Sequence, residues 1–433
     1  MPNTTNSPTP TQRPQTTQRP QPARRPQPPH PPQKNNLFLE VFRTLITPDR
    51  NTVYRVRGGV DRIFLIIVVL LVCYGSVMVA SASYVFARSQ MGDSFYFIKK
   101  QLLWATIGII AMAVMSFVDY GFLKKATPAI FAVSYFLLWL VFVPVIGVTS
   151  KGATRWVNLY FIQFQPSDVM KFALVLMMAL YISKFQRKAK TFQYGILCPA
   201  CIVILVCGTV ALEKHMSATI ILFIIGASMI FIAGADMKWV GGIGISFAAA
   251  AAGLIIFTDY TKARVDAWLH PENDLGGSGW QPYQSLLAIG SGGIFGVGLG
   301  NSYQKHLWLP EPQNDFIFAI VCEELGIIGA FALIALFLLL MWRGFVISAK
   351  APDTFSSLLV MGLTLKVSIQ AILNIAVVTT TIPTTGIALP FFSYGGTALV
   401  MQLAEMGIIL SISRFSSGEK SVFENKQFSH QSA

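Results

Sequence analysis

Long apolar runs, each about the length of a membrane-spanning helix, alternate with short polar connections through most of this 433-residue chain. An α-helix rises about 1.5 Å per residue, so about 20 apolar residues cross the hydrocarbon core of a bilayer. Ten such runs lie at residues 63–83, 97–117, 126–147, 167–183, 194–212, 217–235, 239–257, 315–341, 356–380 and 391–413. The pattern therefore predicts an all-α polytopic membrane protein, a bundle of about ten transmembrane helices.

One long interruption separates the seventh run from the eighth, and it predicts a large loop at residues 258–314. Within it, Asp266 to Asn314 combine many glycines with Asp, Glu, His, Lys and Trp. Irregular backbone cannot face lipid, because its unpaired N–H and C=O groups would each cost several kcal/mol. We therefore expect this segment to lie in water, against protein or at the bilayer interface, and to carry the working surface of the protein.

Basic residues occur in alternate connections, which sets the predicted orientation. They are Arg55, Arg57, Arg62, Lys124, Lys125, Lys184, Arg187, Lys188, Lys190, Lys238, Arg343, Lys350 and Arg414. Because basic connections stay in the cytoplasm, both termini are predicted to be cytoplasmic and the large loop extracytoplasmic. The net charge of +13 is then mostly a topology signal, with some attraction to anionic lipids. Nucleic-acid binding is disfavoured, because the charges are spread over many short loops.

Composition supports the membrane class and divides the chain. Hydrophobic residues make up 53% and charged residues 12%, against about 25% charged in a typical soluble domain. Residues 1–61 are predicted to be a disordered cytoplasmic leader with a juxtamembrane segment, 62–414 the membrane domain, and 415–433 a cytoplasmic tail. Cys198 and Cys201 have the spacing of a redox motif, but their apolar helix favours buried thiols. No cluster of His and Cys suggests a structural metal site.

Polar residues collect where the runs end on the predicted outer side. Arg155 lies after the third run, Glu213 to Ser217 between the fifth and sixth, and Ser393 before the tenth. Asp168 and Lys171, at the start of the fourth run, are three residues apart and so share one face of a helix. They point either to a cavity or to a structural ion pair at the helix start.

Two further acidic positions stand out. Glu323 and Glu324 lie about two turns into the eighth run, so they must face the bundle interior, bonded to neighbours or lining a cavity. Asp274 lies in the turn-rich segment Pro271–Trp280 of the large loop. A carboxylate there is a candidate general base. The alternative, which the residue pattern alone favours, is a turn aspartate that bonds its own backbone.

Several of these motifs, taken in order, resemble the SEDS family (shape, elongation, division and sporulation proteins). They are GATRW, QPSDVMK, DLGGSGW with Gln284-Ser285, AIGSGG, GLGNS, LPE with NDFIFA, EELG and LPFFSYGG, and the likeness covers about residues 60–415. The resemblance implies bacterial ten-span proteins of the cytoplasmic membrane that polymerise lipid II into peptidoglycan strands on its outer face. It also implies that Asp274 is the family's essential loop aspartate, for which we propose the role of general base, and that Asp168 and Lys171 are the family's acid-plus-lysine pair.

The resemblance extends to substrate, partners and cofactor. Together with the topology, it predicts substrate-binding roles for Arg155, Asp168, Lys171, Gln284, Ser285, Lys305, Glu311 and Ser393, with Arg155 and Lys171 the nearest cations for an anionic leaving group and Lys305 a weaker candidate. It implies lipid II, a class B penicillin-binding protein, other divisome membrane proteins and membrane lipids as partners, and no nucleic acid. Mg²⁺ or Mn²⁺ could lie between a pyrophosphate and a carboxylate, but no ligand set is visible. The N-terminal tail and the segments VMVASAS and LPFFSYGGTALV are closest to the family's division member, which predicts a location at the division septum. The family's elongation and sporulation members remain alternatives.

The sequence departs from the family pattern at three places, and two other functions remain open. Leu275 stands where many members have Pro, Asn314 where many have Thr, and Glu213-Lys-His215-Met-Ser217 replaces the usual Glu/Gln-Pro-Asp-Leu-Gly. A lipid II flippase also has many spans and buried charges, but the polar motifs gather at the outer face rather than at mid-membrane. A non-catalytic divisome scaffold would tolerate replacement of Asp274.

Overall fold

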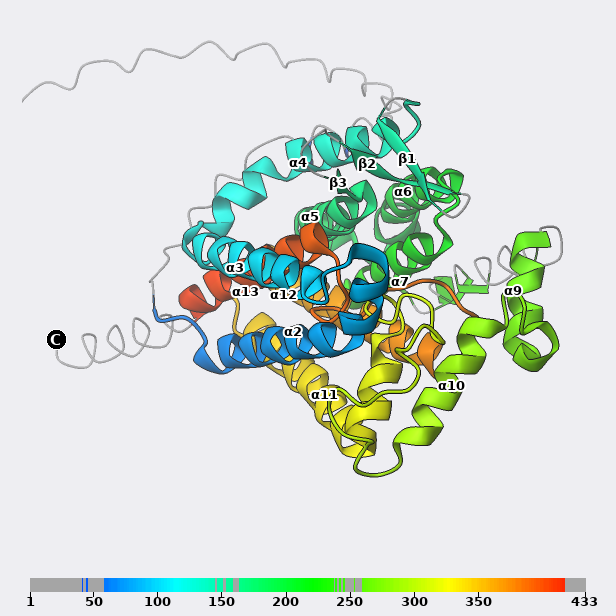
Figure 1. Ribbon diagram of the computed structural model, residues 1–433. Helices are drawn as coiled ribbons and strands as arrows, with labels where there is room; N and C mark the ends of the chain where they lie inside the picture. The colour runs from blue at the N-terminus through cyan, green and yellow to red at the C-terminus, as the bar shows by residue number, and fades with distance from the viewer. Residues whose placement is uncertain are drawn as a thin grey trace, which may run out of the picture.

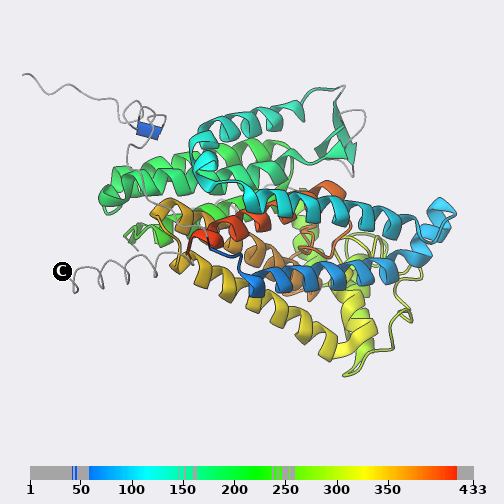
Figure 2. The ribbon, with the colours of Figure 1, turned by 90° about the vertical axis from the view of Figure 1, so that its left-hand side faces the viewer.

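The computed structural model describes residues 41, 44–45, 58–144, 146–150, 153–158, 163–236, 238–239, 241–242, 244–245, 253 and 259–416. Each expected run except the seventh corresponds to a described helix. These helices are α2 (Arg62–Met91), α3 (Tyr96–Phe117), α4 (Tyr120–Leu140), α5 (Pro166–Phe185), α6 (Cys198–Leu212), α7 (Met216–Ile232), α11 (Ile317–Ala349), α12 (Thr354–Val378) and α13 (Gly396–Ser416). The seventh run, 239–257, lies almost wholly outside the described residues. Figures 1 and 2 show the long helices as one bundle.

By length and composition, 7 helices of the described residues can cross a membrane, and α7 is a shorter apolar helix. The predicted all-α multi-pass architecture is thus confirmed. Local caps begin several of the spans. Asp61 accepts a hydrogen bond from the Phe64 amide at 2.9 Å, and Asp353 with Ser356 forms a capping box at the start of α12. Such caps satisfy amide groups that the first turn of a helix leaves without partners.

Helix α5 is the centre of the bundle. Its side chains from Met170 to Ile182 are buried on nearly all sides, and it packs against α4, α7 and α12. A helix that is apolar all round is expected in such a position. Pro166 occupies the first turn, where a missing backbone N–H costs nothing. The start of α5 therefore fixes Asp168 and Lys171 at one end of a rigid core.

A small antiparallel sheet follows α4, which the apolar pattern does not predict. The third run was expected to continue to residue 147, but α4 ends at Leu140. Strands β1 (Gly147–Ser150), β2 (Ala153–Asn158) and β3 (Gln163–Phe164) then pair in the order β1-β2-β3. Val157 pairs with Phe164, so β2 is aligned with the segment that leads into α5.

The large loop contains more regular structure than its glycine content suggests. It includes α9 (Asp259–Leu269), the 3₁₀ turn η3 (Pro271–Asp274) and α10 (Trp280–Gly292). Helix α10 packs against α11, and α11 is interrupted at Gly326, whose φ is 64° and ψ is −164°.

A π-helical turn, η2 (Phe192–Leu197), leads into α6. Cys198 and Cys201 lie on α6 as free thiols.

A charged cavity at one end of the bundle

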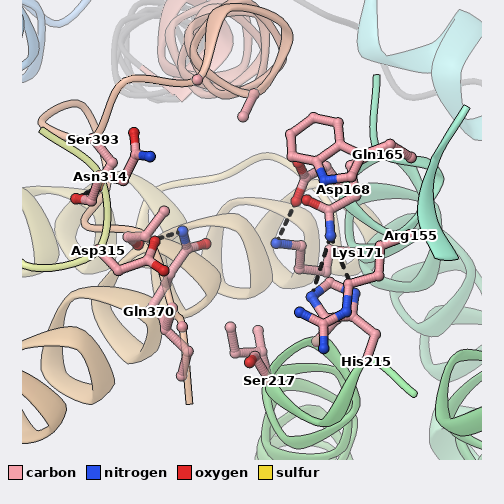
Figure 3. A pocket seen from close by; sticks show the side chains of 18 of the residues that line it. Arg155, Gln165, Asp168, Lys171, His215, Ser217, Asn314, Asp315, Gln370 and Ser393 are labelled. Carbon is pink, nitrogen blue, oxygen red and sulfur yellow. Dashed lines mark hydrogen bonds and ion pairs between the residues drawn. The ribbon is translucent and has the colours of Figure 1, made fainter. Parts of the chain in front are cut away.

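A cavity of about 370 Å³ lies where β2, the start of α5, the α6–α7 turn, the segment before α11, α12 and the turn before α13 converge. Its lining residues are Arg155, Trp156, Gln165, Asp168, Lys171, His215, Ser217, Ala218, Ile221, Glu311, Asn314, Asp315, Gln370, Gly386, Ile387, Ala388, Ser393, Tyr394, Gly395 and Ala398. Figure 3 shows two polar groups facing each other across it, one around Asp168 and one around Asp315.

The first group is built on the start of α5. The Lys171 ammonium lies 2.6 Å from the Asp168 carboxylate, and their side chains are 8% and 20% exposed. The two residues are three positions apart, so the helix itself brings them together. The pair is therefore a preformed dipole in the cavity wall. A second buried pair, formed by Lys366 and Glu405, is close enough to interact with it electrostatically.

Arg155 reaches the same wall from β2. Its Nη2 donates a 2.9 Å hydrogen bond to the Lys214 carbonyl, whereas its buried Nε has no hydrogen-bond partner among the described residues. Lys214 has a positive φ of 56°, so the α6–α7 turn is bent to present this carbonyl. Arg155 is thus held at one end of its guanidinium and keeps donor capacity toward the cavity.

His215 begins α7 and lies between these charges. Gln165 Nε2 lies 3.1 Å from its Nδ1, and the Ser167 hydroxyl lies 3.3 Å from the same atom. Burial, together with the nearby Arg155 and Lys171 cations, lowers the pKa of His215 to about 3. The imidazole is therefore neutral at physiological pH and adds no charge to the cavity.

Glu213 lies in the α6–α7 turn and is buried close to Arg155. Its side chain is 3% exposed, and neither carboxyl oxygen has a hydrogen-bond partner within the described part of the chain. Burial raises its pKa to about 8, and the Arg155 charge opposes this rise. Glu213 therefore keeps its proton at neutral pH, which leaves the Arg155 charge unneutralised from that side.

The second group is formed by the segment before α11 and the turn before α13. Asn314 donates to Glu311 at 3.2 Å, and the Ser393 hydroxyl donates to the Asn314 carbonyl at 2.9 Å. Asn374 on α12 donates to the Asp315 carbonyl at 2.7 Å. These bonds tie two segments that are far apart in sequence into one wall that carries acidic and amide side chains.

The structure brings together five of the predicted site residues, Arg155, Asp168, Lys171, Glu311 and Ser393, around one cavity. The other four lie elsewhere. Gln284 and Ser285 are buried on α10, where the Ser285 hydroxyl donates to the Val378 carbonyl at 2.7 Å. Lys305 is 3% exposed and lies 2.8 Å from Glu324, outside the lining of this cavity.

Asp274 is exposed and also does not line the cavity. Its Oδ2 accepts hydrogen bonds from the Ser278 amide at 2.9 Å and from the Ser278 hydroxyl at 3.1 Å. In this structure Asp274 thus makes the contacts of a turn aspartate. The same carboxylate is accessible to a ligand or to a segment that closes over it.

The two buried acids of α11, Glu323 and Glu324, behave as the pattern predicted. Glu323 accepts from the Tyr303 amide at 2.8 Å and from the Ser302 hydroxyl at 2.5 Å. Glu324 accepts from the Ser81 hydroxyl at 2.7 Å and pairs with Lys305. Both side chains are fully buried and bonded to neighbours.

Sequence reasoning did not assign several lining residues. His215 and Asp315 lie in motifs that the sequence singles out, but their roles need the partners that only packing supplies. Gln370 lies on α12, where nothing in the pattern sets it apart. The buried pair Lys366–Glu405 could have been predicted from the sequence, because ionisable residues inside apolar runs are rare and mark interior contacts.

The described residues contain no group of three or more His, Cys, Asp and Glu side chains arranged to hold a metal ion. Asp168, the acid on which the first group is built, is already paired with Lys171. The described donor set therefore does not form a ready divalent-cation site.

A family model described as cell cycle protein, which groups FtsW, RodA and SpoVE, matches residues 61–418. The chain belongs to this family. A probable peptidoglycan glycosyltransferase FtsW of Geobacter sp. (strain M18) is 41% identical over 356 residues, covering 82% of this chain and 97% of the relative. Stage V sporulation protein E of Bacillus subtilis (strain 168) is 39% identical over 364 residues, covering 82% and 97%.

Solved structures agree on the fold. A chain from a peptidoglycan synthase complex that coordinates polymerization and crosslinking matches with a TM-score of 0.69 at 24% identity, covering 83% of this chain and 99% of that chain. The rod shape determining protein RodA of Thermus thermophilus matches with a TM-score of 0.61 at 24% identity, covering 82% and 97%. The SEDS resemblance is thus confirmed as family membership, and the protein is a multi-pass membrane protein with a RodA-like fold.

Proposed function

We propose that this protein is a peptidoglycan glycosyltransferase that polymerises lipid II into glycan strands on the outer face of the bacterial cytoplasmic membrane. The observation that carries the proposal is the cavity, where Arg155 and the Asp168–Lys171 pair meet at one end of the bundle. The names of the relatives support the same activity. The positions of the basic connections support cytoplasmic termini and a cavity that opens toward the outer side.

The proposed reaction joins two lipid II molecules. The 4-hydroxyl oxygen of the acceptor sugar attacks the anomeric carbon of the donor, and the bond from that carbon to the pyrophosphate oxygen breaks. The hydroxyl proton passes to Asp274, acting as general base. The polyprenyl pyrophosphate leaves as an anion, and the Arg155 guanidinium and Lys171 ammonium stabilise its charge.

This assignment requires Asp274 to approach the cavity during the reaction. The carboxylate is exposed, and its described hydrogen bonds are those to Ser278 within the same turn. We propose that binding of lipid II draws the turn over the cavity, because water must be excluded from the leaving pyrophosphate.

A class B penicillin-binding protein is the proposed partner that crosslinks the strands. One structural neighbour comes from a complex that couples polymerization with crosslinking, which supports this partner for a protein of the same fold. Relatives named FtsW support a role in division at the septum, together with the other divisome membrane proteins.

The decisive experiment measures glycan polymerisation from purified lipid II, with the cognate partner made transglycosylase-free. It compares wild type with Asp274→Asn, and Ser278→Ala serves as a matched control that keeps the carboxylate and removes one of its turn contacts. Polymer from wild type and Ser278→Ala but not from folded Asp274→Asn supports the proposal.

Equal polymer from Asp274→Asn would reject Asp274 as the base and direct attention to Asp168 or Glu311, which line the cavity. No polymer from wild type, under conditions in which a control enzyme works, would favour a lipid II flippase or a non-catalytic scaffold. The structure offers no specific support for either, because the polar lining lies at helix ends rather than at mid-span.

A further inference from the structure

Helix α10 has the opposite polarity to a helix that faces water. Its buried side includes Gln284 and Ser285, whereas Leu286 and Leu287 are 40% and 43% exposed. The exposed positions continue at Gly290 and Ser291, one turn farther along the same face. A surface helix in water turns its polar residues outward. An apolar outward face is the arrangement that a lipid environment favours.

The chain beyond α10 extends this apolar surface. Ile294 is 61% exposed and Phe295 is 80% exposed, immediately after the helix ends. Directly after the break in α11, Ile327, Ile328 and Phe331 are 50%, 54% and 67% exposed. We call the exposed side chains of Leu286, Leu287, Ile294, Phe295, Ile327, Ile328 and Phe331 the apolar ledge.

The two parts of the ledge are joined by backbone hydrogen bonds. The amides of Ile327 and Ile328 donate to the carbonyls of Gly293 and Ile294 at 3.0 and 3.3 Å. In return, the Val297 and Gly298 amides donate at 2.9 and 3.0 Å to the carbonyls of Glu323 and Glu324.

These bonds satisfy the backbone groups that a helix break exposes. In water such groups can bond solvent, but in lipid they must be paired within the protein. The pairing across Gly326 therefore makes an irregular turn compatible with a lipid environment.

The position of the ledge agrees with this environment. In Figure 1, α10 and the first part of α11 run side by side toward the same turn, and in Figure 2 this yellow part of α11 crosses the direction of the spans. In Figure 2 the blue connection between α2 and α3 reaches farther outward than this turn. No Asp, Glu, Lys or Arg occurs from Leu275 to Gln304, so nothing charged opposes insertion.

Beyond the break, the ledge continues into the outward face of α11. Leu338, Leu339 and Trp342 are 54%, 46% and 54% exposed, and they follow Phe331 at helical spacing along a span. Exposed apolar side chains gathered in this number need a covering phase. Because the same face continues along a membrane span, the covering phase is lipid.

We propose that the apolar ledge is a membrane-inserted surface, which lies in the leaflet at the large-loop end of the bundle and contacts lipid acyl chains. The large loop is then anchored in the bilayer rather than suspended in water. The function proposed above does not depend on this anchoring, and the anchoring does not depend on that function.

The test places a nitroxide label at Phe295→Cys, and separately at Ile294→Cys, in the full-length protein reconstituted in lipid nanodiscs. Cys73 and Cys201, the native thiols that are not buried, are replaced by alanine. Label accessibility to oxygen, which concentrates in lipid, is compared with accessibility to a water-soluble nickel chelate. Leu338→Cys is the lipid-facing control and Asn273→Cys the water-facing control.

The proposal expects an oxygen-to-nickel accessibility ratio at positions 294 and 295 that matches Leu338→Cys and exceeds Asn273→Cys several-fold. A ratio like that of Asn273→Cys would place the ledge in water and overturn the proposal. Low accessibility to both reagents would show that protein covers the ledge, either a second copy or another segment, and would also overturn it. Folding of each labelled variant is checked by its thermal unfolding temperature against the unlabelled parent.

Discussion

The Asp168 carboxylate and the Lys171 ammonium lie 2.6 Å apart on the first two turns of α5, with side chains 20% and 8% exposed. Removing one partner of a buried pair leaves an uncompensated charge and costs about 3–5 kcal/mol. We expect Asp168→Asn and Lys171→Met each to lower the free energy of unfolding, toward the lower end of that range because Asp168 is partly exposed. Each should also abolish polymerisation.

The double variant Asp168→Asn/Lys171→Met checks whether the two residues act as a pair. It should regain most of the unfolding temperature lost by the single variants while remaining inactive, as measured by thermal unfolding in detergent and by the lipid II assay. A double variant as unstable as the sum of the single variants would show that the two charges do not compensate each other.

Lys305 offers a contrast, because its partner is Glu324 and it lies outside the lining of the charged cavity. Lys305→Met leaves a fully buried carboxylate unpaired, with an expected loss of about 3–5 kcal/mol. The Lys305→Met/Glu324→Gln variant should recover most of it. The apparent KM of the remaining folded enzyme for lipid II should match wild type. A raised KM with an unchanged unfolding temperature would instead assign Lys305 to the substrate.

Glu213 predicts a pH dependence of stability. Its pKa rises from 4.5 to about 8 on folding, because the carboxyl is buried. Between these values the unfolded chain releases the proton while the folded protein retains it. Rising pH therefore favours the unfolded state, and stability is lost progressively from about pH 4.5 to about pH 8.

The variant Glu213→Gln cannot ionise and should escape this loss. Its unfolding temperature relative to wild type should increase between about pH 5 and about pH 8.5, measured by intrinsic fluorescence in detergent. A difference that stays constant with pH would mean that Glu213 does not change its protonation behaviour on folding.

Gly326 predicts a strict requirement for glycine. Its φ of 64° and ψ of −164° fall in a region that other residues avoid, and an added Cβ would clash with the backbone of Ile294 and Gly296. Gly326→Ala should lower the free energy of unfolding by at least about 1–3 kcal/mol. Gly290→Ala on α10 is the matched control, because no atom lies within 4 Å of its added Cβ. Equal unfolding temperatures for the two variants would contradict the strain argument.

The sequence by itself determined the features that depend on short stretches of chain. The apolar runs predicted where the described spans lie, because a helix in lipid pairs its own backbone and needs only length and composition. The spacing of three residues predicted that the side chains of Asp168 and Lys171 share one face of a helix, and the structure pairs them. The depth of Glu323 and Glu324 in the eighth run predicted their burial, which the structure confirms.

Tertiary structure decided which of the distant polar residues meet. Arg155 reaches the Asp168–Lys171 pair only because β2 aligns with the segment before α5. Lys305 pairs with Glu324 instead of joining that cavity, and α10 turns Gln284 and Ser285 inward and its leucines outward. Local pattern cannot supply these outcomes. A charged or polar group buried in the bundle takes whichever partner helix packing brings within bonding distance, since leaving it unpaired costs more than any local preference.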